Sequence, residues 1–488
     1  IYALEQMMLQ SGWGQIPVLG SNQRLIGIVT RTDLIKHWAQ THPQHVEATP
    51  RIDVSQIQQV LGENASQLIF AVGELAQTRG QEVYMVGGCV RDLLLRRRNL
   101  DIDFVVEGDA IRFAEAMSAT YGGDTSSFRP FGTAKWFPDE TTHTRLGLKH
   151  NDTPEHIDFA SARNEFYEHP TALPTVYSGS IKLDLQRRDF TINALAVQIS
   201  PGFGRILDYY GGLRDLEAKH LRVLHSLSFI DDPTRILRAV RFEQRLKFEI
   251  EARTEALIPP ALAMLGRITG ERVRNELALL LNEQLPEDGF LSLARRGALK
   301  AIHPALRFDE NTADLFRRAR AIDVPEGCAI VIPDIYWHLL ALSMTPEEAD
   351  SMCERLRIPR TMQTSVPQTA RLNDELRRLI DSIAAPSVIT RTLETYAVDA
   401  LLAQFIRAEP ESPERIMIAG FLSSWRHVKP TIDGHRLIEL GLKPGPCFRE
   451  ILDRLCAARL DGEIRDEESE WSLLQTWLKS GICDDDVR

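Results

Sequence analysis

The fold of this chain is decided by residues 82–103, which read EVYMVGGCVRDLLLRRRNLDID. The apolar run Glu82–Val86 predicts a β-strand that ends in Gly87 and Gly88 and leads into a helix predicted at Val90–Leu95. The two glycines allow the backbone to approach a ligand closely, and the helix start offers free N–H groups that suit a triphosphate. Arg91 lies one turn into the helix and can reach the same anion. The alternative is a plain strand-to-helix turn.

Two carboxylates stand at the beginning of the next predicted strand, Ile102–Val106. Because alternate residues on a strand point to one face, Asp101 and Asp103 are expected to converge on one spot. Two carboxylates together with phosphate oxygens are a common way to hold Mg²⁺, so this pair predicts a metal site. The alternative is a structural pair compensated by the basic run at residues 96–98.

A second group of polar residues occupies positions 187–194, RRDFTINA. Arg187 and Arg188 can clamp a phosphate bidentately, and Asp189 and Asn193 can fix ribose hydroxyls. The alternative is a salt-bridged helix start.

A third group lies at residues 231–242, DDPTRILRAVRF, where an acidic pair and a proline mark a helix start. The spacing of three and four places four arginines on one helix face: Arg235, Arg238, Arg241 and Arg245. They repel one another unless they face an anion. The alternative is a solvated basic face.

The order of the predicted elements indicates an α+β protein. A helix is expected at Val54–Thr78, and strands are expected at Ala134–Phe137, Ile157–Ala160 and Ala194–Ile199. From Leu224 onward amphipathic helices dominate, so a domain boundary is expected near residue 220.

The first 45 residues predict a helix, strands at Gln15–Leu19 and Leu25–Val29, and a second helix. A unit of this size cannot bury a sufficient core alone, so we expect the chain to be a fragment of a longer protein.

The composition bounds the class of protein. The 488 residues are 43% hydrophobic and 26% charged, which is typical of globular proteins with several domains. No apolar run is long enough for a membrane span, and the expected location is cytoplasmic. The net charge of −11 argues against nucleic-acid binding over the whole surface but permits a local basic groove. The six cysteines form no CxxC pair, so their spacing does not predict a zinc site.

Taken in order, the three groups and the later segment GERVRNE at 270–276 resemble the bacterial-type (class II) tRNA nucleotidyltransferase and poly(A) polymerase family, over about residues 82–281. The resemblance implies a polymerase-β-like nucleotidyltransferase head followed by all-α neck, body and tail domains. The segments GQIPV at 14–18 and GIVTRTD at 27–33 resemble part of a CBS unit, with a structural spacer as the alternative. The predicted domains are a partial CBS motif at 1–45, a linker and helix at 46–80, the head at 81–220, the helical neck with a base-reading motif at 221–290, and a tRNA-binding helical body and tail at 291–488.

The resemblance also assigns roles to residues. The metal-binding catalytic carboxylates fall on Asp101 and Asp103, and Asp158 falls where the family can place a third. Nucleotide binding falls on a larger set: Gly87, Gly88, Arg91, Arg187, Arg188, Asp189, Asn193, Asp232, Arg235, Arg238 and Arg241.

The base-reading pair is Asp232 with Arg235, and Asp231 replaces the family's glutamate, a change that we expect to be tolerated. A carboxylate accepts from the amino group of adenine or cytosine while a guanidinium donates to the ring nitrogen. Guanine and uracil present a carbonyl and a ring N–H at these positions, so they match neither the carboxylate nor the guanidinium. The pair therefore predicts ATP or CTP, without a template, and does not choose between them.

This chain resembles the A-adding members of the family in two ways: it combines a CBS unit with this head, and its sequence at residues 167–182 is similar to theirs. The resemblance therefore implies Mg²⁺-dependent addition of AMP from ATP to the 3′ end of tRNA that ends in CC. The alternatives are a full CCA-adding enzyme, then a CC-adding enzyme or a poly(A) polymerase. A non-enzymatic alternative is a regulatory module that binds adenylates or RNA.

Overall fold

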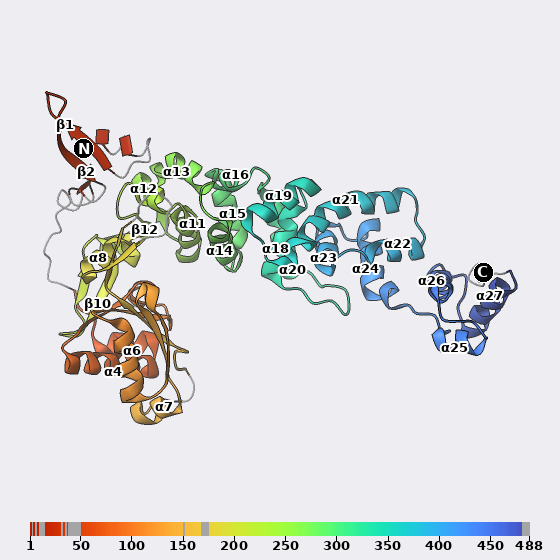
Figure 1. Cartoon of the computed structure of the whole chain (residues 1–488), viewed down its shortest axis with the longest axis horizontal. Coiled ribbons are helices and arrows are strands. Elements are labelled where there is room, and N and C mark those ends of the chain that lie inside the picture. Colours follow the sequence, from red (N-terminus) through yellow and green to blue (C-terminus); the bar gives the residue numbers. More distant parts are fainter. Residues whose placement is uncertain are drawn as a thin grey trace. The chain divides into compact units, whose positions relative to one another are not determined.

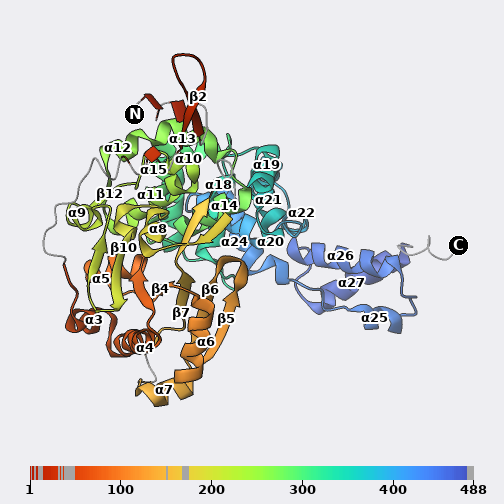
Figure 2. The same cartoon turned by 60° about the vertical axis from the view of Figure 1, so that its left-hand side comes forward.

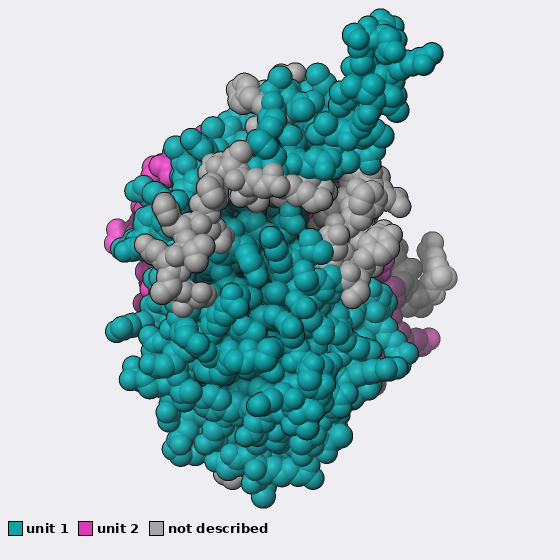
Figure 3. Space-filling view, turned by 90° about the vertical axis from the view of Figure 1, so that its left-hand side faces the viewer, with its two compact units in different colours: residues 1–268 teal, residues 269–488 magenta. Residues whose placement is uncertain are grey.

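A computed structural model of the chain describes residues 15–30, 50–149, 152–166 and 175–480, with eight single positions nearer the N-terminus, namely 1, 3, 4, 7, 8, 33, 34 and 37. The chain divides into two compact units, Ile1–Ile268 and Thr269–Arg488. The first contains all the described strands, and the described elements of the second are helical (Figure 1). Figure 3 colours the two units separately.

The centre of the first unit is a seven-stranded sheet in the order β11-β10-β3-β4-β7-β6-β5. Strands β4 and β7 are parallel, and every other neighbouring pair is antiparallel. The strands are β3 (Glu82–Val86), β4 (Ile102–Glu107), β5 (Asp124–Phe128), β6 (Thr133–Phe137), β7 (Ile157–Ser161), β10 (Leu195–Ser200) and β11 (Ile206–Asp208). The predicted strands in this region are therefore confirmed to within one or two residues.

The two faces of the sheet are covered differently. Helices α4 (Glu63–Arg79) and α6 (Ala110–Tyr121) pack on one face, where Phe113 of α6 meets Phe159 and Phe159 stacks on Phe104 (Figure 2). On the other face, Ile181 and Leu185 of helix α8 (Ile181–Gln186) pack against Tyr84, Val86 and Val105. Asp103 is the register partner of Val86, so it lies on the α8 face.

The helix predicted at Val54–Thr78 is wrong as a single element. The structure has two helices there, α3 (Val54–Leu61) and α4, separated by Gly62. Gly62 has a φ of +91°, which other residues adopt only with strain, so the backbone turns at this position. Asp53 caps α3 with a capping box. The helix predicted at Val90–Leu95 exists but begins earlier, as α5 (Gly88–Leu94).

The remaining elements of the first unit are short. The predicted N-terminal strands are present as an antiparallel hairpin, and two-stranded pairings β8–β9 and β12–β13 lie outside the main sheet. These elements are β1 (Gln15–Leu19), β2 (Leu25–Thr30), η1 (Arg129–Phe131), α7 (Glu140–Leu146), β8 (Arg163–Phe166), β9 (Thr175–Ser178), η2 (Thr191–Asn193), α9 (Gly212–Glu217), β12 (His220–Leu221), α10 (Ser228–Asp231), α11 (Thr234–Leu246), β13 (Glu249–Ile250), α12 (Ala252–Ala256) and α13 (Ile258–Leu265). The helices predicted at 1–9 and after Thr30 fall largely outside the described residues.

The second unit has two apolar centres. Phe290, Phe308, Phe316 and Tyr336 pack ring against ring near its beginning, and a separate cluster around Leu437, Ile451 and Leu474 holds its last three helices together. Its elements are α14 (Gly270–Leu281), α15 (Pro286–Arg295), α16 (Ala298–Ile302), α17 (Glu310–Ala321), α18 (Ile332–Ala341), α19 (Pro346–Leu356), α20 (Arg360–Gln363), α21 (Ser365–Asp381), α22 (Pro386–Leu393), α23 (Val398–Arg407), α24 (Pro413–Ser423), η3 (Trp425–His427), α25 (Gly434–Glu439), α26 (Pro446–Leu460) and α27 (Glu467–Lys479). Among the described helices, none combines the length and the apolar character needed to cross a membrane.

Candidate functional site

Charged side chains form a row across three adjacent strands. Asp103 on β4 pairs in register with Asp158 on β7, and Asp158 pairs in register with Lys135 on β6. Register partners share a face of the sheet, so the three side chains lie side by side on the face that also carries α8. Asp101 lies one residue before β4, and its backbone N–H donates to the side chain of Asn99 at 3.0 Å. The structure thus brings both predicted carboxylates and Asp158 to one edge of the head.

The ligand atoms of Asp101, Asp158 and His156 lie within 4.8 Å of one another, which is the spacing of a group that can hold a metal ion. Asp103 stands outside this triplet but beside it. Oxygen ligands from carboxylates with one imidazole nitrogen suit a divalent cation. His156 is absent from the residues predicted from the sequence. The sequence does contain a pattern that points to His156, because His156 and Asp158 are spaced along a strand in the same way as Asp101 and Asp103.

The electrostatics of Asp103 reflect this crowding. Burial and the neighbouring Asp101 carboxylate raise the pKa of Asp103 to about 6, and the Arg188 guanidinium opposes the shift. The basic run at 96–98 turns elsewhere, because Arg97 donates to the carbonyl of Arg245 and Arg98 pairs with Asp152. The carboxylates are therefore not neutralised by these two arginines, and their basic neighbours are Lys135 and Arg188 instead.

The turn between β3 and α5 brings its backbone close to a guanidinium. Gly87 has a φ of +77°, and a Cβ added there would lie 2.9 Å from Nη1 of Arg188 and 3.6 Å from Oδ2 of Asp103. Arg188 pairs with Asp184 at 3.1 Å, and its buried Nε has no hydrogen-bond partner among the described residues. A side chain at position 87 would crowd Nη1 of Arg188, so glycine at this turn lets the backbone lie close to the guanidinium.

Arg91 has a different place from the one expected. It is 3% exposed, and its guanidinium donates twice to Asp92 at 2.8 Å and once to Oδ1 of Asn193 at 2.8 Å. It also lies over the ring of Phe242 at 5.1 Å. In this geometry Arg91 anchors Asn193, and it supports the site through that contact.

The segment 187–193 is tied to helix α11. Asp189 accepts from Asn193 at 2.9 Å and from two nitrogens of Arg238 at 2.8 and 2.7 Å. Burial alone would raise the pKa of Asp189, but Arg238 and the hydrogen bond from Asn193 outweigh it and hold the pKa below its usual value. Arg187 pairs with Asp184 at 2.6 Å. The predicted nucleotide-binding residues of both segments therefore share one network.

Two arginines of the predicted basic face of α11 point into the protein, whereas Arg245 is exposed. Arg235 and Arg241 are each 7% exposed, which excludes a solvated face for them. Arg235 donates to Ser228 at 2.6 Å and to the carbonyl of Arg187 at 2.8 Å, and Arg241 lies over the Phe242 ring at 4.9 Å. Asp232 accepts from the hydroxyl of Thr234 at 2.6 Å. The predicted base-reading residues thus lie beside the Arg187 segment.

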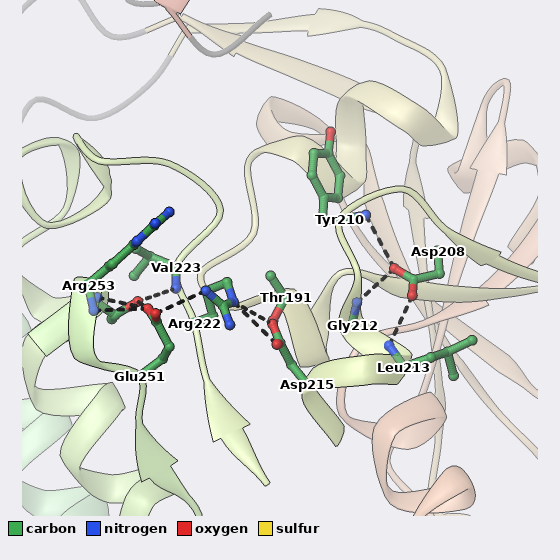
Figure 4. A network of polar contacts seen from close by, with 11 residues as sticks. Thr191, Asp208, Tyr210, Gly212, Leu213, Asp215, Arg222, Val223, Glu251 and Arg253 are labelled. Atoms are coloured by element: carbon green, nitrogen blue, oxygen red, sulfur yellow. Dashed lines mark hydrogen bonds and ion pairs between the residues drawn. The ribbon is translucent and has the colours of Figure 1, made fainter. Parts of the chain in front are cut away.

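A second polar network contacts the segment 187–193 through Thr191 (Figure 4). Asp215 of α9 accepts from Thr191 at 2.7 Å and from Arg222 at 3.0 Å, and Arg222 also pairs with Glu251 at 3.2 Å. Asp208 accepts from three backbone N–H groups at the start of α9, those of residues 210, 212 and 213. The position of residues 191–193 is therefore fixed by α9 and by the strands β12 and β13.

Comparisons with known families agree with this arrangement. Residues 83–222 match the family described as the poly(A) polymerase head domain, which contains the acidic row and the Gly87 turn. Residues 247–309 match a probable RNA- and SrmB-binding site of polymerase A, and residues 1–40 match the CBS domain.

Curated relatives extend over most of the chain. An A-adding tRNA nucleotidyltransferase of Halalkalibacterium halodurans is 30% identical over 435 residues, covering 88% of this chain and 96% of the relative. Another, of Geobacter sulfurreducens, is 36% identical over 93% of this chain but 53% of the relative, so the chain spans about half its length. A CC-adding tRNA nucleotidyltransferase of the same organism is 31% identical over 81% of this chain and 91% of the relative.

Solved structures are similar as well. A CCA-adding enzyme in apo form has a TM-score of 0.72 at 31% identity, covering 87% of this chain and 99% of that one. The CCA-adding enzyme of Thermotoga maritima in complex with tRNA has a TM-score of 0.67 at 30% identity, covering 87% and 98%.

Proposed function

Because this chain belongs to the tRNA nucleotidyltransferase and poly(A) polymerase family, we propose that it transfers AMP from ATP to the 3′ end of tRNA that already ends in CC. The observation that supports A addition is that A-adding relatives match more of this chain, at 36% identity over 93% of it and 30% over 88% of it, than the CC-adding relative, which is 31% identical over 81% of it. The reaction needs a divalent cation, which we propose to be Mg²⁺, and a tRNA substrate implies action in the cytoplasm.

The residues divide the work by position. Asp101 and Asp103 would hold Mg²⁺, which lowers the pKa of the attacking 3′-hydroxyl and neutralises charge on the triphosphate. Arg188 and the backbone at Gly87 would bind the triphosphate, since Nη1 of Arg188 lies against this turn and its buried Nε has no hydrogen-bond partner among the described residues. Asp189 and Asn193 would orient the ribose.

Base selection would fall to Asp232 and Arg235. Both bases that these residues accept, adenine and cytosine, present an amino donor beside a ring-nitrogen acceptor. The pair therefore excludes GTP and UTP but does not separate ATP from CTP. Selection of A must come from the primer, because an A-adding enzyme has to accept a 3′ end that is already two nucleotides longer.

The test supplies three tRNAs, ending at the discriminator base, at C and at CC, each with ATP alone or with ATP and CTP. The expected result is one added A on the CC-ending tRNA and no use of CTP on any primer. The Asp101→Asn variant serves as the inactive control.

Other products would overturn A addition in defined ways. Incorporation of CTP onto the discriminator end would indicate a CCA-adding or a CC-adding enzyme, which are distinguished by whether A follows. A long A tail would indicate a poly(A) polymerase. Binding of ATP or tRNA with no product at any Mg²⁺ concentration would indicate a regulatory module.

A further inference from the structure

One edge of the acidic row contains a nitrogen ligand that the proposed reaction does not yet use. The imidazole of His156 lies just before β7, and its ligand atom falls within 4.8 Å of those of Asp101 and Asp158. Ligands around a small divalent ion at about 2.1 Å lie roughly 3 to 4 Å from each other, so a small closure completes the site.

The side-chain ammonium of Lys135 already lies beside His156 and Asp158. The ammonium Nζ of Lys135 lies 2.7 Å from Nε2 of His156 and 3.3 Å from Oδ2 of Asp158. An ammonium has only donors, so at this distance Nε2 of His156 acts as the acceptor and directs its lone pair at the positive charge. The same lone pair is the one that a metal ion would take.

The lysine can leave this position. Its side chain is 45% exposed, whereas the side chains of His156 and Asp158 are 25% and 29% exposed. An ammonium that moves into solvent regains its hydration, and the two ligands that it leaves behind are held by the rigid strand β7 and its flank. Exchange of the ammonium for an ion therefore requires one flexible side chain to move.

We propose that His156 is a nitrogen ligand of a divalent cation held with Asp101 and Asp158, and that this cation displaces the Lys135 ammonium. A catalytic role for this ion rests on the proposed function, whereas the detection of the ion does not. Imidazole nitrogen suits transition-metal ions, whereas Mg²⁺ prefers oxygen ligands, and Mn²⁺ is a transition-metal ion that also accepts carboxylate oxygen. The chain should accordingly bind Mn²⁺ more tightly than the carboxylates alone would.

The test uses Mn²⁺ as the probe on the full chain without nucleotide or RNA. Electron spin echo envelope modulation detects a ¹⁴N nucleus bound directly to Mn²⁺. The wild type is expected to show this coupling at one equivalent of Mn²⁺, and the His156→Gln variant is expected to bind Mn²⁺ without it. His435→Gln, which removes an exposed histidine of α25, is the matched control and should keep the coupling.

Affinity supplies a second measurement. The concentration of free Mn²⁺ is followed by its electron paramagnetic resonance signal during a titration. Compared with the wild type, His156→Gln is expected to bind Mn²⁺ about tenfold more weakly. Lys135→Met is expected to bind it more tightly, because this variant lacks the ammonium that competes with the ion. Wild-type Mn²⁺ without nitrogen coupling, or equal affinity in all three proteins, would overturn the ligand assignment. A chain that shows the coupling but adds no nucleotide to tRNA would overturn the proposed function and leave this site standing.

Discussion

Single residues set the charge of the site. Asp103 and Asp158 are neighbours across two strands and would repel each other if both were ionised without compensation. Arg188 reduces this repulsion beside Asp103, and Lys135 reduces it beside Asp158. The two carboxylates therefore lie between two positive charges.

Gly87 controls access to this centre. In Gly87→Ala the new Cβ would meet Arg188 at 2.9 Å in a backbone conformation that alanine adopts with strain of about 2 kcal/mol. We expect affinity for ATP, measured by calorimetry, to fall at least tenfold while the protein stays folded. Gly147→Ala is the matched control, because Gly147 also has a positive φ of +64° but nothing within 4 Å of an added Cβ. Equal ATP affinity in both variants would contradict the role of this turn.

His338 is a residue whose protonation state matters for stability. It is 0% exposed on α18, its Nδ1 lies 2.9 Å from the hydroxyl of Thr369, and burial lowers its pKa to about 4. The unfolded chain takes up a proton near pH 6.5 and the folded chain does not. This contribution is therefore complete above pH 6.5 and lost as the pH falls toward 4, by about 3 kcal/mol.

The measurement is urea unfolding at pH 7.5, 6 and 5 for the wild type and for His338→Gln. The stability difference between the two proteins should shrink as the pH falls, since glutamine does not titrate. A difference that stays constant across this range would show that folding does not lower the pKa of His338.

The sequence revealed part of the site at this scale. Asp101, Asp103 and Gly87 could be predicted because strand alternation and turn chemistry are local. Lys135 was missed because its contact with His156 depends on the pairing of β6 with β7, which joins residues some 20 positions apart along the chain. His156 alternates with Asp158 along one strand, but its closeness to Asp101 depends on the pairing of β7 with β4. No local pattern states which strands become neighbours.

At the scale of elements, one ion pair joins α11 to the segment 187–193. Arg238→Ala would leave the buried Asp189 carboxylate without its strongest partner, at a cost of about 3 kcal/mol in unfolding free energy at pH 7. The pKa of Asp189 would then rise, so this deficit should become smaller as the pH falls toward 4.

Three further variants check this assignment by urea unfolding: Arg245→Ala, Asp189→Asn, and Arg238→Ala combined with Asp189→Asn. Arg245→Ala, an exposed arginine on the same helix, should change stability by less than about 0.5 kcal/mol. The double variant Arg238→Ala with Asp189→Asn should recover part of the loss, because the unpaired charge is removed. A double variant as unstable as the sum of both single ones would contradict a direct pair.

Element prediction failed where backbone geometry overrode periodicity. The apolar spacing through residues 54–78 continues across Gly62, so the pattern predicts one helix, whereas the positive φ of Gly62 ends α3 and starts α4. The strands of the central sheet were predicted closely because each is a short apolar run bounded by polar or glycine residues. Their order in the sheet was not predictable from such runs.

At the scale of the whole molecule, the chain consists of two units with separate apolar centres. The acidic row lies in residues 1–268, so ligand binding there should stabilise that unit alone. Scanning calorimetry is expected to show two transitions, of which Mg²⁺ with ATP at about 100 times Kd raises one by roughly 5 to 10 °C.

The Asp101→Asn variant is the control for this experiment, and neither of its transitions should respond to Mg²⁺ with ATP. One transition that moves as a whole would show that the two units unfold together.

The chain of contacts through Thr191, Asp215, Arg222 and Glu251 has a consequence for local opening. The amide of Thr191 donates to the carbonyl of Arg222 at 2.9 Å, and the amide of Glu251 donates to that of Leu221 at 3.0 Å. Both amides are held by carbonyls of the same short stretch, Leu221 and Arg222, so displacement of this stretch would release both, and their protons are expected to exchange with deuterium at one shared rate. Arg222→Ala should speed the exchange of both amides equally, as read by mass spectrometry of the peptides that contain them. Acceleration of only one amide would mean that the two sides open separately.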